Sequence, residues 1–155
     1  MDVFEIIHND HEAVQKILTD LEETTSRAHQ KRKEGLAKFT QEIEPHMLAE
    51  EEVFYPQIQD AGKDETEVRQ HVIEGYDEHR LAKMVLSELQ QMDTQDEAWA
   101  PKLKVLKDLI EHHIEEEESE IFEGAREVLN QNQIDQVTKQ FQQAKDQQMQ
   151  KGATA

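Results

Sequence analysis

Apolar residues recur every three or four positions in four stretches of this chain, and a few polar residues fall in phase with them. Such spacing puts the recurring residues on one face of a helix. The four stripes, in chain order, are Phe4, Ile7, His11, Val14, Leu18 and Leu21; Leu36, Phe39, Ile43, His46, Glu50 and Val53; Val68, Val72, Gly75, His79, Ala82, Leu86 and Leu89; and Leu103, Leu106, Ile110, His113, Glu117 and Ile121. The pattern predicts four amphipathic helices and an all-α fold.

Turn-forming residues separate the four stripes. The stretches DAGKDET (60–66) and MDTQDEAWAP (92–101) contain Gly, Asp and Pro, and TTSRAHQKR (24–32) is polar. Short links favour antiparallel neighbours, so we expect an antiparallel up-down-up-down four-helix bundle. A Gln-rich stretch over about 133–150 has a thin apolar stripe and predicts an extra C-terminal helix. The expected organisation is a bundle over 1–130 and a C-terminal helix and tail over 131–155.

Composition narrows the classes of partner. The formal net charge is −18, which disfavours nucleic acid and anionic membranes because both need clustered Lys and Arg. The chain has no cysteine, which excludes disulfides and thiolate metal sites. No apolar run is long enough to span a membrane, and the acidic start MDVFEIIHND does not resemble a secretory signal. We therefore expect a cytoplasmic location, whereas the oligomeric state stays open.

One histidine interrupts the apolar stripe of every predicted helix: His11, His46, His79 and His113. A single histidine in such a stripe is ordinarily a hydrogen-bonded core residue. Here, however, the midpoint in sequence between each two consecutive histidines falls inside the predicted turn that separates their helices. Antiparallel packing then places all four imidazoles in one layer, which indicates a shared role.

Two carboxylates extend this layer, since Glu50 follows His46 by four residues and Glu117 follows His113 by four. Burying an ionised carboxylate costs several kcal/mol unless it is paired or binds a metal. Imidazole and carboxylate donors suit Fe, Mn or Zn, and two bridging carboxylates suit a pair of ions. The stretches DHEAVQKIL at Asp10 and EHRLAKMVL at Glu78 are also alike, so each half of the chain brings two histidines and one carboxylate.

The ordered set of His11, His46-x-x-x-Glu50, His79 and His113-x-x-x-Glu117 resembles the hemerythrin-like (HHE cation-binding) family over about residues 3–128. The resemblance implies two iron ions bridged by the two glutamates and by an oxo, hydroxo or water ligand, with Mn or Zn as other possible metals. Ferritin-like bundles use two Glu-x-x-His motifs, and that spacing occurs here only at Glu5 and His8.

Two positions depart from the family pattern. Oxygen-carrying hemerythrins have a further histidine four residues before the one at His79, and here that residue is Gly75, so water, substrate or a protein oxygen such as that of Tyr55 would fill its place. Phe54 follows His46 by eight residues but Phe122 follows His113 by nine, which indicates a π-bulge. Helix geometry favours Glu117 as the bridging carboxylate, and the aromatic spacing favours Glu118.

Three roles fit such a centre. The first is a binding or sensing module that takes up O₂, NO, peroxide or iron, in sensing, storage or stress defence. The second is a di-iron enzyme that consumes peroxide or reactive nitrogen species, and the third is a purely structural metal site. The expected partner is accordingly a small diatomic molecule or peroxide.

Overall fold

Helices account for all the regular secondary structure of the computed structural model, which describes residues 1–154, with side chains as far as residue 152. The elements are α1 (Val3–Glu22), α2 (His29–Ala49), η1 (Glu50–Phe54), α3 (Tyr55–Ala61), α4 (Thr66–Gln90), α5 (Trp99–Glu116), η2 (Glu117–Ile121), α6 (Phe122–Val128) and α7 (Gln131–Thr154). The prediction of an all-α chain is confirmed.

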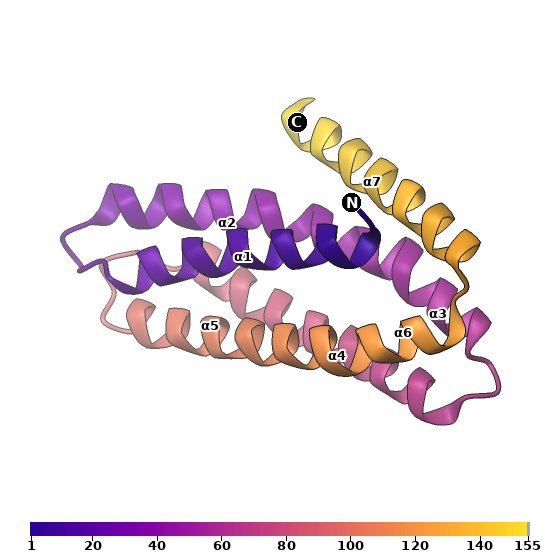
Figure 1. Ribbon diagram of the computed structural model, residues 1–155. Helices are drawn as coiled ribbons and strands as arrows, with labels where there is room; N and C mark the ends of the chain where they lie inside the picture. The colour runs from indigo at the N-terminus through magenta and orange to yellow at the C-terminus, as the bar shows by residue number, and fades with distance from the viewer. Residues whose placement is uncertain (155) are drawn as a thin grey trace.

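The elements form a small number of continuous rods. Figure 1 shows that α2 and α3 follow one another along one path, as do α5 and α6, and that the chain reverses direction after α1, α3 and α4. In space α1 packs against α2 and α5, and α4 packs against α3 and α5. None of the helices within the described residues is both long and apolar enough to cross a membrane.

The predicted turns hold with one correction. The links after α3 and α4 fall within the expected stretches, but α2 already begins at His29, inside the stretch 24–32. Arg32 is buried in the first turn of α2 and donates to the carbonyl groups of Thr24 and Thr94, at 3.1 and 2.7 Å. Its guanidinium also lies 4.3 Å from the ring centre of Trp99. This side chain therefore ties the two links at one end of the helices together.

The apolar core is divided into two clusters. One contains Phe39, Trp99 and Leu106 and lies towards the end with Arg32. The other contains Phe4, Phe54 and Phe122, whose rings meet edge to face at centroid distances of 5.0 to 6.2 Å. The stripe histidines lie where the chain passes from one cluster to the other: α1, α4, α2 with its continuation η1, and α5 with its continuation η2 each contribute to both clusters. A polar layer therefore lies between two apolar clusters.

The helix α7 folds back against the other helices rather than extending away from them (Figure 1). Val137 and Phe141 of its apolar stripe are buried against α1, α2 and η1. Thr138 accepts a hydrogen bond of 2.9 Å from the backbone N–H of Val3, one of the first N–H groups of α1 that have no partner inside that helix. The expected C-terminal helix is present and is longer than predicted.

Candidate metal centre

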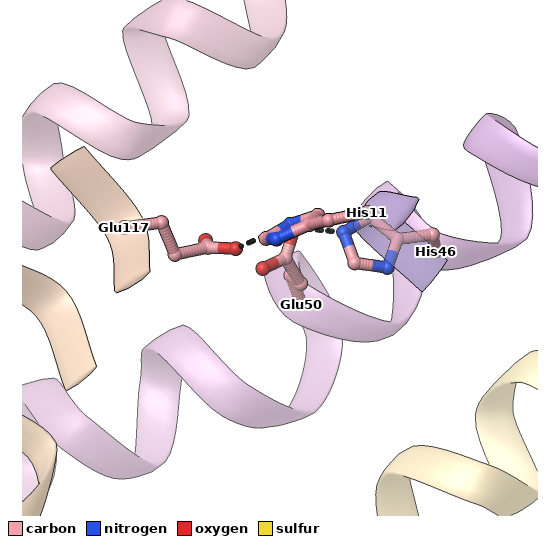
Figure 2. A group of neighbouring side chains, drawn as sticks. All are labelled: His11, His46, Glu50 and Glu117. Carbon is pink, nitrogen blue, oxygen red and sulfur yellow. Dashed lines mark ion pairs between the residues drawn. The ribbon is translucent and has the colours of Figure 1, made fainter. Parts of the chain in front are cut away.

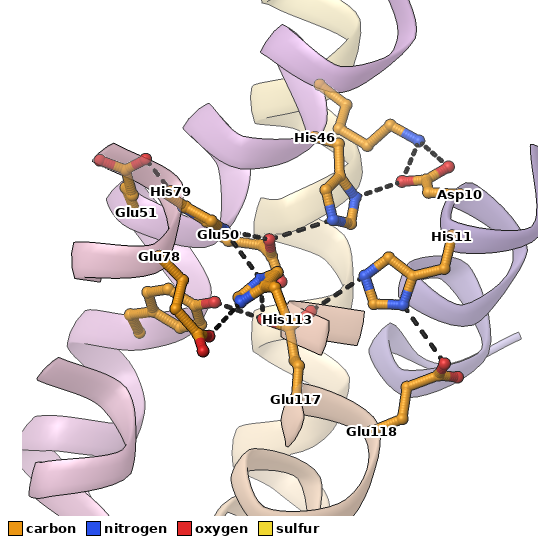
Figure 3. Close-up of polar contacts among 12 residues, drawn as sticks. Asp10, His11, His46, Glu50, Glu51, Glu78, His79, His113, Glu117 and Glu118 are labelled. Carbon is orange, nitrogen blue, oxygen red and sulfur yellow. Dashed lines mark hydrogen bonds and ion pairs between the residues drawn. The ribbon is translucent and has the colours of Figure 1, made fainter. Parts of the chain in front are cut away.

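The four predicted histidines lie in one layer, as required by their spacing from the turns. His11, His46, His79 and His113 come from α1, α2, α4 and α5, and each is at most 5% exposed. The rings pair edge to face: His11 with His46 at a centroid distance of 5.0 Å, and His79 with His113 at 4.6 Å. The two pairs face each other across the interior (Figure 3).

The carboxylates of Glu50 and Glu117 lie between these pairs and are fully buried. Oε1 of Glu50 is 3.0 Å from Nε2 of His46 and 3.1 Å from Nε2 of His79. Glu117 similarly lies 3.1 Å from Nε2 of His11 and 3.5 Å from Nε2 of His113. Each carboxylate therefore reaches one histidine of each pair.

These six residues form two overlapping groups, in each of which the donor atoms lie within 4.8 Å of one another. We call His11, His46, Glu50 and Glu117 the first donor group (Figure 2), and Glu50, His79, His113 and Glu117 the second donor group. Glu50 and Glu117 belong to both. The arrangement offers two adjacent cation positions with two shared carboxylates.

Several donor atoms of the first donor group are not satisfied by one another, whereas Nε2 of His79 and Nε2 of His113 in the second group form a hydrogen bond of 3.1 Å. Nε2 of His11, Nε2 of His46, both oxygens of Glu50 and Oε1 of Glu117 are buried without a hydrogen bond of acceptable geometry, although some of them lie near 3 Å apart. Buried polar atoms in folded proteins are almost always paired. Nitrogen and oxygen donors left unpaired and converging on one place fit a bound transition-metal ion.

In the metal-free protein, protons on the layer histidines balance the negative charge of the buried carboxylates. Burial alone would lower the pKa of His46, but the charges of Glu50 and Asp10 outweigh it and raise that pKa to about 10. The pKa values of His11 and His113 are raised as well, because burial is outweighed in both by Glu117. Burial would raise the pKa of Glu117, but the neighbouring Glu50 carboxyl group and the charge of His113 hold it well below its usual range. A cation entering the layer would therefore displace protons.

A second set of carboxylates faces the outer ring nitrogen, Nδ1, of each of the four histidines in the layer (Figure 3). The partners are Asp10 for His46 at 2.9 Å, Glu51 for His79 at 2.9 Å, Glu78 for His113 at 2.7 Å and Glu118 for His11 at 3.5 Å. A carboxylate that accepts the Nδ1 proton leaves Nε2 facing inward with its lone pair free, which is the tautomer a metal requires.

Three of these outer carboxylates, Asp10, Glu51 and Glu78, were missed by the sequence analysis. A signal for them is present, since Asp10 and Glu78 each precede a stripe histidine, and Glu51 and Glu118 each follow a stripe glutamate. The pairing thus obeys the same internal repeat as the inner residues. Single acidic residues outside the stripes look like ordinary solvent-facing charges, so only the comparison of the two halves would have revealed them.

The structure separates Glu117 from Glu118. Glu117 points into the layer, whereas the side chain of Glu118 is 26% exposed and lies outside His11, where it also hydrogen-bonds to His8. Both η1 and η2 are π-helical turns, in which the N–H of Tyr55 donates to the carbonyl of Glu50 and that of Phe122 to Glu117. Phe122 therefore corresponds to Tyr55, and the match of Phe54 with Phe122 that favoured Glu118 does not hold.

The phenol of Tyr55 occupies the space beside Gly75. The side chain is fully buried, its ring stacks on His79 at a centroid distance of 5.5 Å, and its hydroxyl donates to Oε2 of Glu117. A Cβ atom at Gly75 would lie 3.0 Å from the Tyr55 hydroxyl and 3.1 Å from Ile121. Glycine is thus what allows the phenol to reach the second donor group.

The remaining histidines lie outside the layer. His8 contacts Glu118 and Glu12, and His71 pairs with Glu120 at 3.0 Å on the surface of α4 and η2. His112 is 60% exposed and lies within 3.5 Å of Glu78 and Glu116. The fourth, His29, is exposed in the first turn of α2 and hydrogen-bonds to Thr94, so none of the four reaches the layer.

A family model and a solved structure point to the same domain type. The model of the hemerythrin HHE cation-binding domain matches residues 2–125. A curated protein named "DNA nickase", from Nostoc sp. (strain PCC 7120), is 28% identical over 146 residues, which cover 94% of this chain and 39% of that protein. The chain therefore spans less than half the length of that relative.

Among solved structures, the crystal structure of a hemerythrin HHE cation-binding domain-containing protein from Mycobacterium kansasii is similar with a TM-score of 0.83. The likeness covers 99% of this chain and 91% of that one at 17% sequence identity. At this identity the likeness establishes the fold.

Proposed function

Because the chain belongs to the hemerythrin HHE cation-binding domain family, we propose that its two donor groups hold a pair of iron ions that react with dioxygen, nitric oxide or peroxide. The observation that carries the proposal is the unpaired state of five buried, inward-facing donor atoms of His11, His46, Glu50 and Glu117. Glu50 and Glu117 would be shared between the two ions, and the antiparallel bundle expected from the sequence would hold these carboxylates in place. Glu118 orients His11 from outside.

Iron fits the donors better than the other candidates. Non-heme iron sites that react with oxygen use histidine and carboxylate ligands and keep positions open for a small molecule. Each donor group brings two imidazoles and shares two carboxylates, which leaves room for such a ligand. When bound, iron supplies the redox chemistry, whereas the protein supplies the ligands and a buried, water-poor setting.

A specific observation favours an enzyme that consumes peroxide as the second candidate. Burial and the carboxylates of Glu117 and Glu50 raise the pKa of Tyr55 well above its usual value, so the phenol keeps its proton in the metal-free protein. A phenol held against Glu117 can supply a proton at the centre, and reduction of peroxide to water consumes protons. The same phenol stands where oxygen carriers have a histidine, which disfavours reversible oxygen carriage.

The name of the Nostoc relative raises DNA as a further partner. We propose that DNA is not a partner of this chain, because its net charge of −18 would repel phosphates. The match covers only 39% of that relative, so its activity as named belongs to a longer protein.

The test is the metal content of the native chain, compared with that of two variants. Glu50→Gln removes a shared carboxylate charge, and Glu52→Gln, an exposed neighbour two residues away, is the matched control. We expect about two irons per chain in the wild type and in Glu52→Gln, and loss of both in Glu50→Gln. Native chain purified without chelators that carries no iron would refute the proposal.

A second measurement separates the candidates. Reduced, iron-loaded protein is titrated with O₂ while its absorption spectrum is recorded, and peroxide consumption is followed separately. A spectrum that reverts on removal of O₂ favours a sensor or carrier. Peroxide turnover that falls at least about tenfold in Tyr55→Phe favours the enzyme, since general acids typically contribute that much or more.

A further inference from the structure

The helix α7 reaches the metal layer through one charged side chain. Nζ of Lys145 lies 2.7 and 2.8 Å from the two carboxylate oxygens of Asp10, and the second of these oxygens lies 2.9 Å from Nδ1 of His46. Lys145 and Asp10 are only 13% and 17% exposed. A continuous chain of charge-assisted hydrogen bonds therefore runs from α7 through α1 to a histidine of the first donor group on α2.

Apolar contact reinforces the same connection. Phe141, one helical turn before Lys145, is fully buried and packs edge-on against the ring of His46 at a centroid distance of 6.2 Å. Residues four apart lie on one face of a helix. One face of α7 thus contacts the ring of His46 through Phe141, and reaches its Nδ1 atom through Lys145 and Asp10.

The second donor group has a more exposed counterpart that does not involve α7: Nζ of Lys83, 49% exposed, lies 2.8 Å from Oε2 of Glu51, and this oxygen lies 2.9 Å from Nδ1 of His79. Glu78 occupies the place of Asp10 and lies 2.7 Å from Nδ1 of His113. Besides His113, Glu78 lies near His112, which is 60% exposed and 3.5 Å away. Nothing corresponding to α7 packs over α4 and α5 among the described residues. The two halves of the internal repeat therefore differ in that α7 covers only the half formed by α1 and α2.

We propose that Lys145 is a positioning residue for His46, so that docking of α7 selectively strengthens metal binding by the first donor group. By fixing both oxygens of Asp10, Lys145 keeps this carboxylate aimed at Nδ1, and His46 is held with Nε2 directed at the cation position. Binding and docking are reciprocal: a metal in the first donor group stabilises α7 on the helices. The inference rests on the proposed function, because it requires two cation positions.

The test is a cobalt(II) titration of the metal-free full chain, followed by visible absorption and by competition with a chelator. Lys145→Met removes the ammonium group and keeps most of the apolar stem, and Lys145→Arg retains the charge. Lys139→Met, on an exposed position of the same helix, is the matched control. Circular dichroism and thermal unfolding of each metal-free variant report on folding.

We expect Lys145→Met to bind one of two cobalt ions about 10-fold more weakly, the lower end of the effect of losing an outer partner of a ligand, because Lys145 acts through Asp10. The affinity for the other ion should stay within about twofold, and Lys145→Arg and Lys139→Met should resemble the wild type. Hydrogen exchange of amides in 137–145 should slow on metal binding in the wild type and less so in Lys145→Met.

The outcomes separate the possible failures. A purely structural Lys145 would lower metal-free stability and leave the ratio of the two affinities unchanged, which would overturn the inference. Two equally tight ions in both wild type and Lys145→Met would overturn it as well, while leaving the proposed function intact. A wild-type chain that binds no cobalt would instead count against the proposed function.

Discussion

Raising the pH should destabilise the metal-free protein well before its lysines titrate. His46 has a pKa of about 10 in the folded chain and about 6.5 when unfolded. A folded-state pKa above the unfolded value gives stability that is fully present below pH 6.5 and is lost as the pH rises towards 10. At 1.36 kcal/mol per pKa unit the difference corresponds to about 5 kcal/mol for this one buried group.

Between pH 7 and 9 the folded state should bind one proton more than the unfolded state at His46 alone. The free energy of unfolding should then fall by about 1.4 kcal/mol per pH unit, and His11 and His113, whose pKa values are also raised, should steepen the slope. Urea denaturation of chelator-treated protein at several pH values measures this dependence of the free energy of unfolding on pH.

Comparison of two variants tests the assignment. His46→Gln should remove about 1.4 kcal/mol per pH unit from the slope, whatever it does to stability at one pH. Gln70→Ala, at an exposed position of α4 that carries no titratable group, should leave the slope unchanged. A metal-free protein with the same stability at pH 7 and 9, or a His46→Gln variant with the wild-type slope, would refute the reasoning.

Three further predictions follow from particular contacts. Gly75→Ala should destabilise the chain by about 1 kcal/mol in urea, because crowding against Tyr55 outweighs the gain in helix propensity, whereas Gly152→Ala, with no atom near its added methyl, should not destabilise it. Arg32→Met should cost about 2–4 kcal/mol, since two backbone carbonyls lose a charged donor, and Arg32→Lys should recover part of this. Metal binding at pH 7 should release about one proton from His46 alone, which calorimetry in two buffers of different ionisation enthalpy detects.

The helices and the histidine layer were predictable because burial follows the helical period. Each stripe histidine is flanked by apolar residues that must face the core, so the same periodicity that predicts the helix also fixes the direction of the imidazole. The turns then fix its height. The link before His29 was predicted less well because that stretch contains neither Gly nor Pro to mark where α2 begins.

The outer carboxylates and the π-helical turn η1 were harder to predict for different reasons. Glu51 and Glu78 lie off the stripes, and what distinguishes them from solvent-facing acids is a partner on another helix. A π-bulge was predicted after His113, where η2 lies, but η1 was missed because it starts at the equivalent glutamate of the other half and leaves the spacing of the two halves equal. The contact of Lys145 with Asp10 joins residues 135 apart and depends on where α7 docks.

The internal repeat explains why two cation positions would form, and the departures from it explain why they would differ. The inner donors and the outer carboxylates repeat in both halves, which gives each pair of histidines the same frame. Tyr55 stacks on His79 of the second donor group and donates to the shared Glu117, whereas α7 adds Lys145 and Phe141 beside His46 of the first. An ion in the first donor group would therefore be held by a histidine that α7 covers, and one in the second would lie beside the Tyr55 phenol.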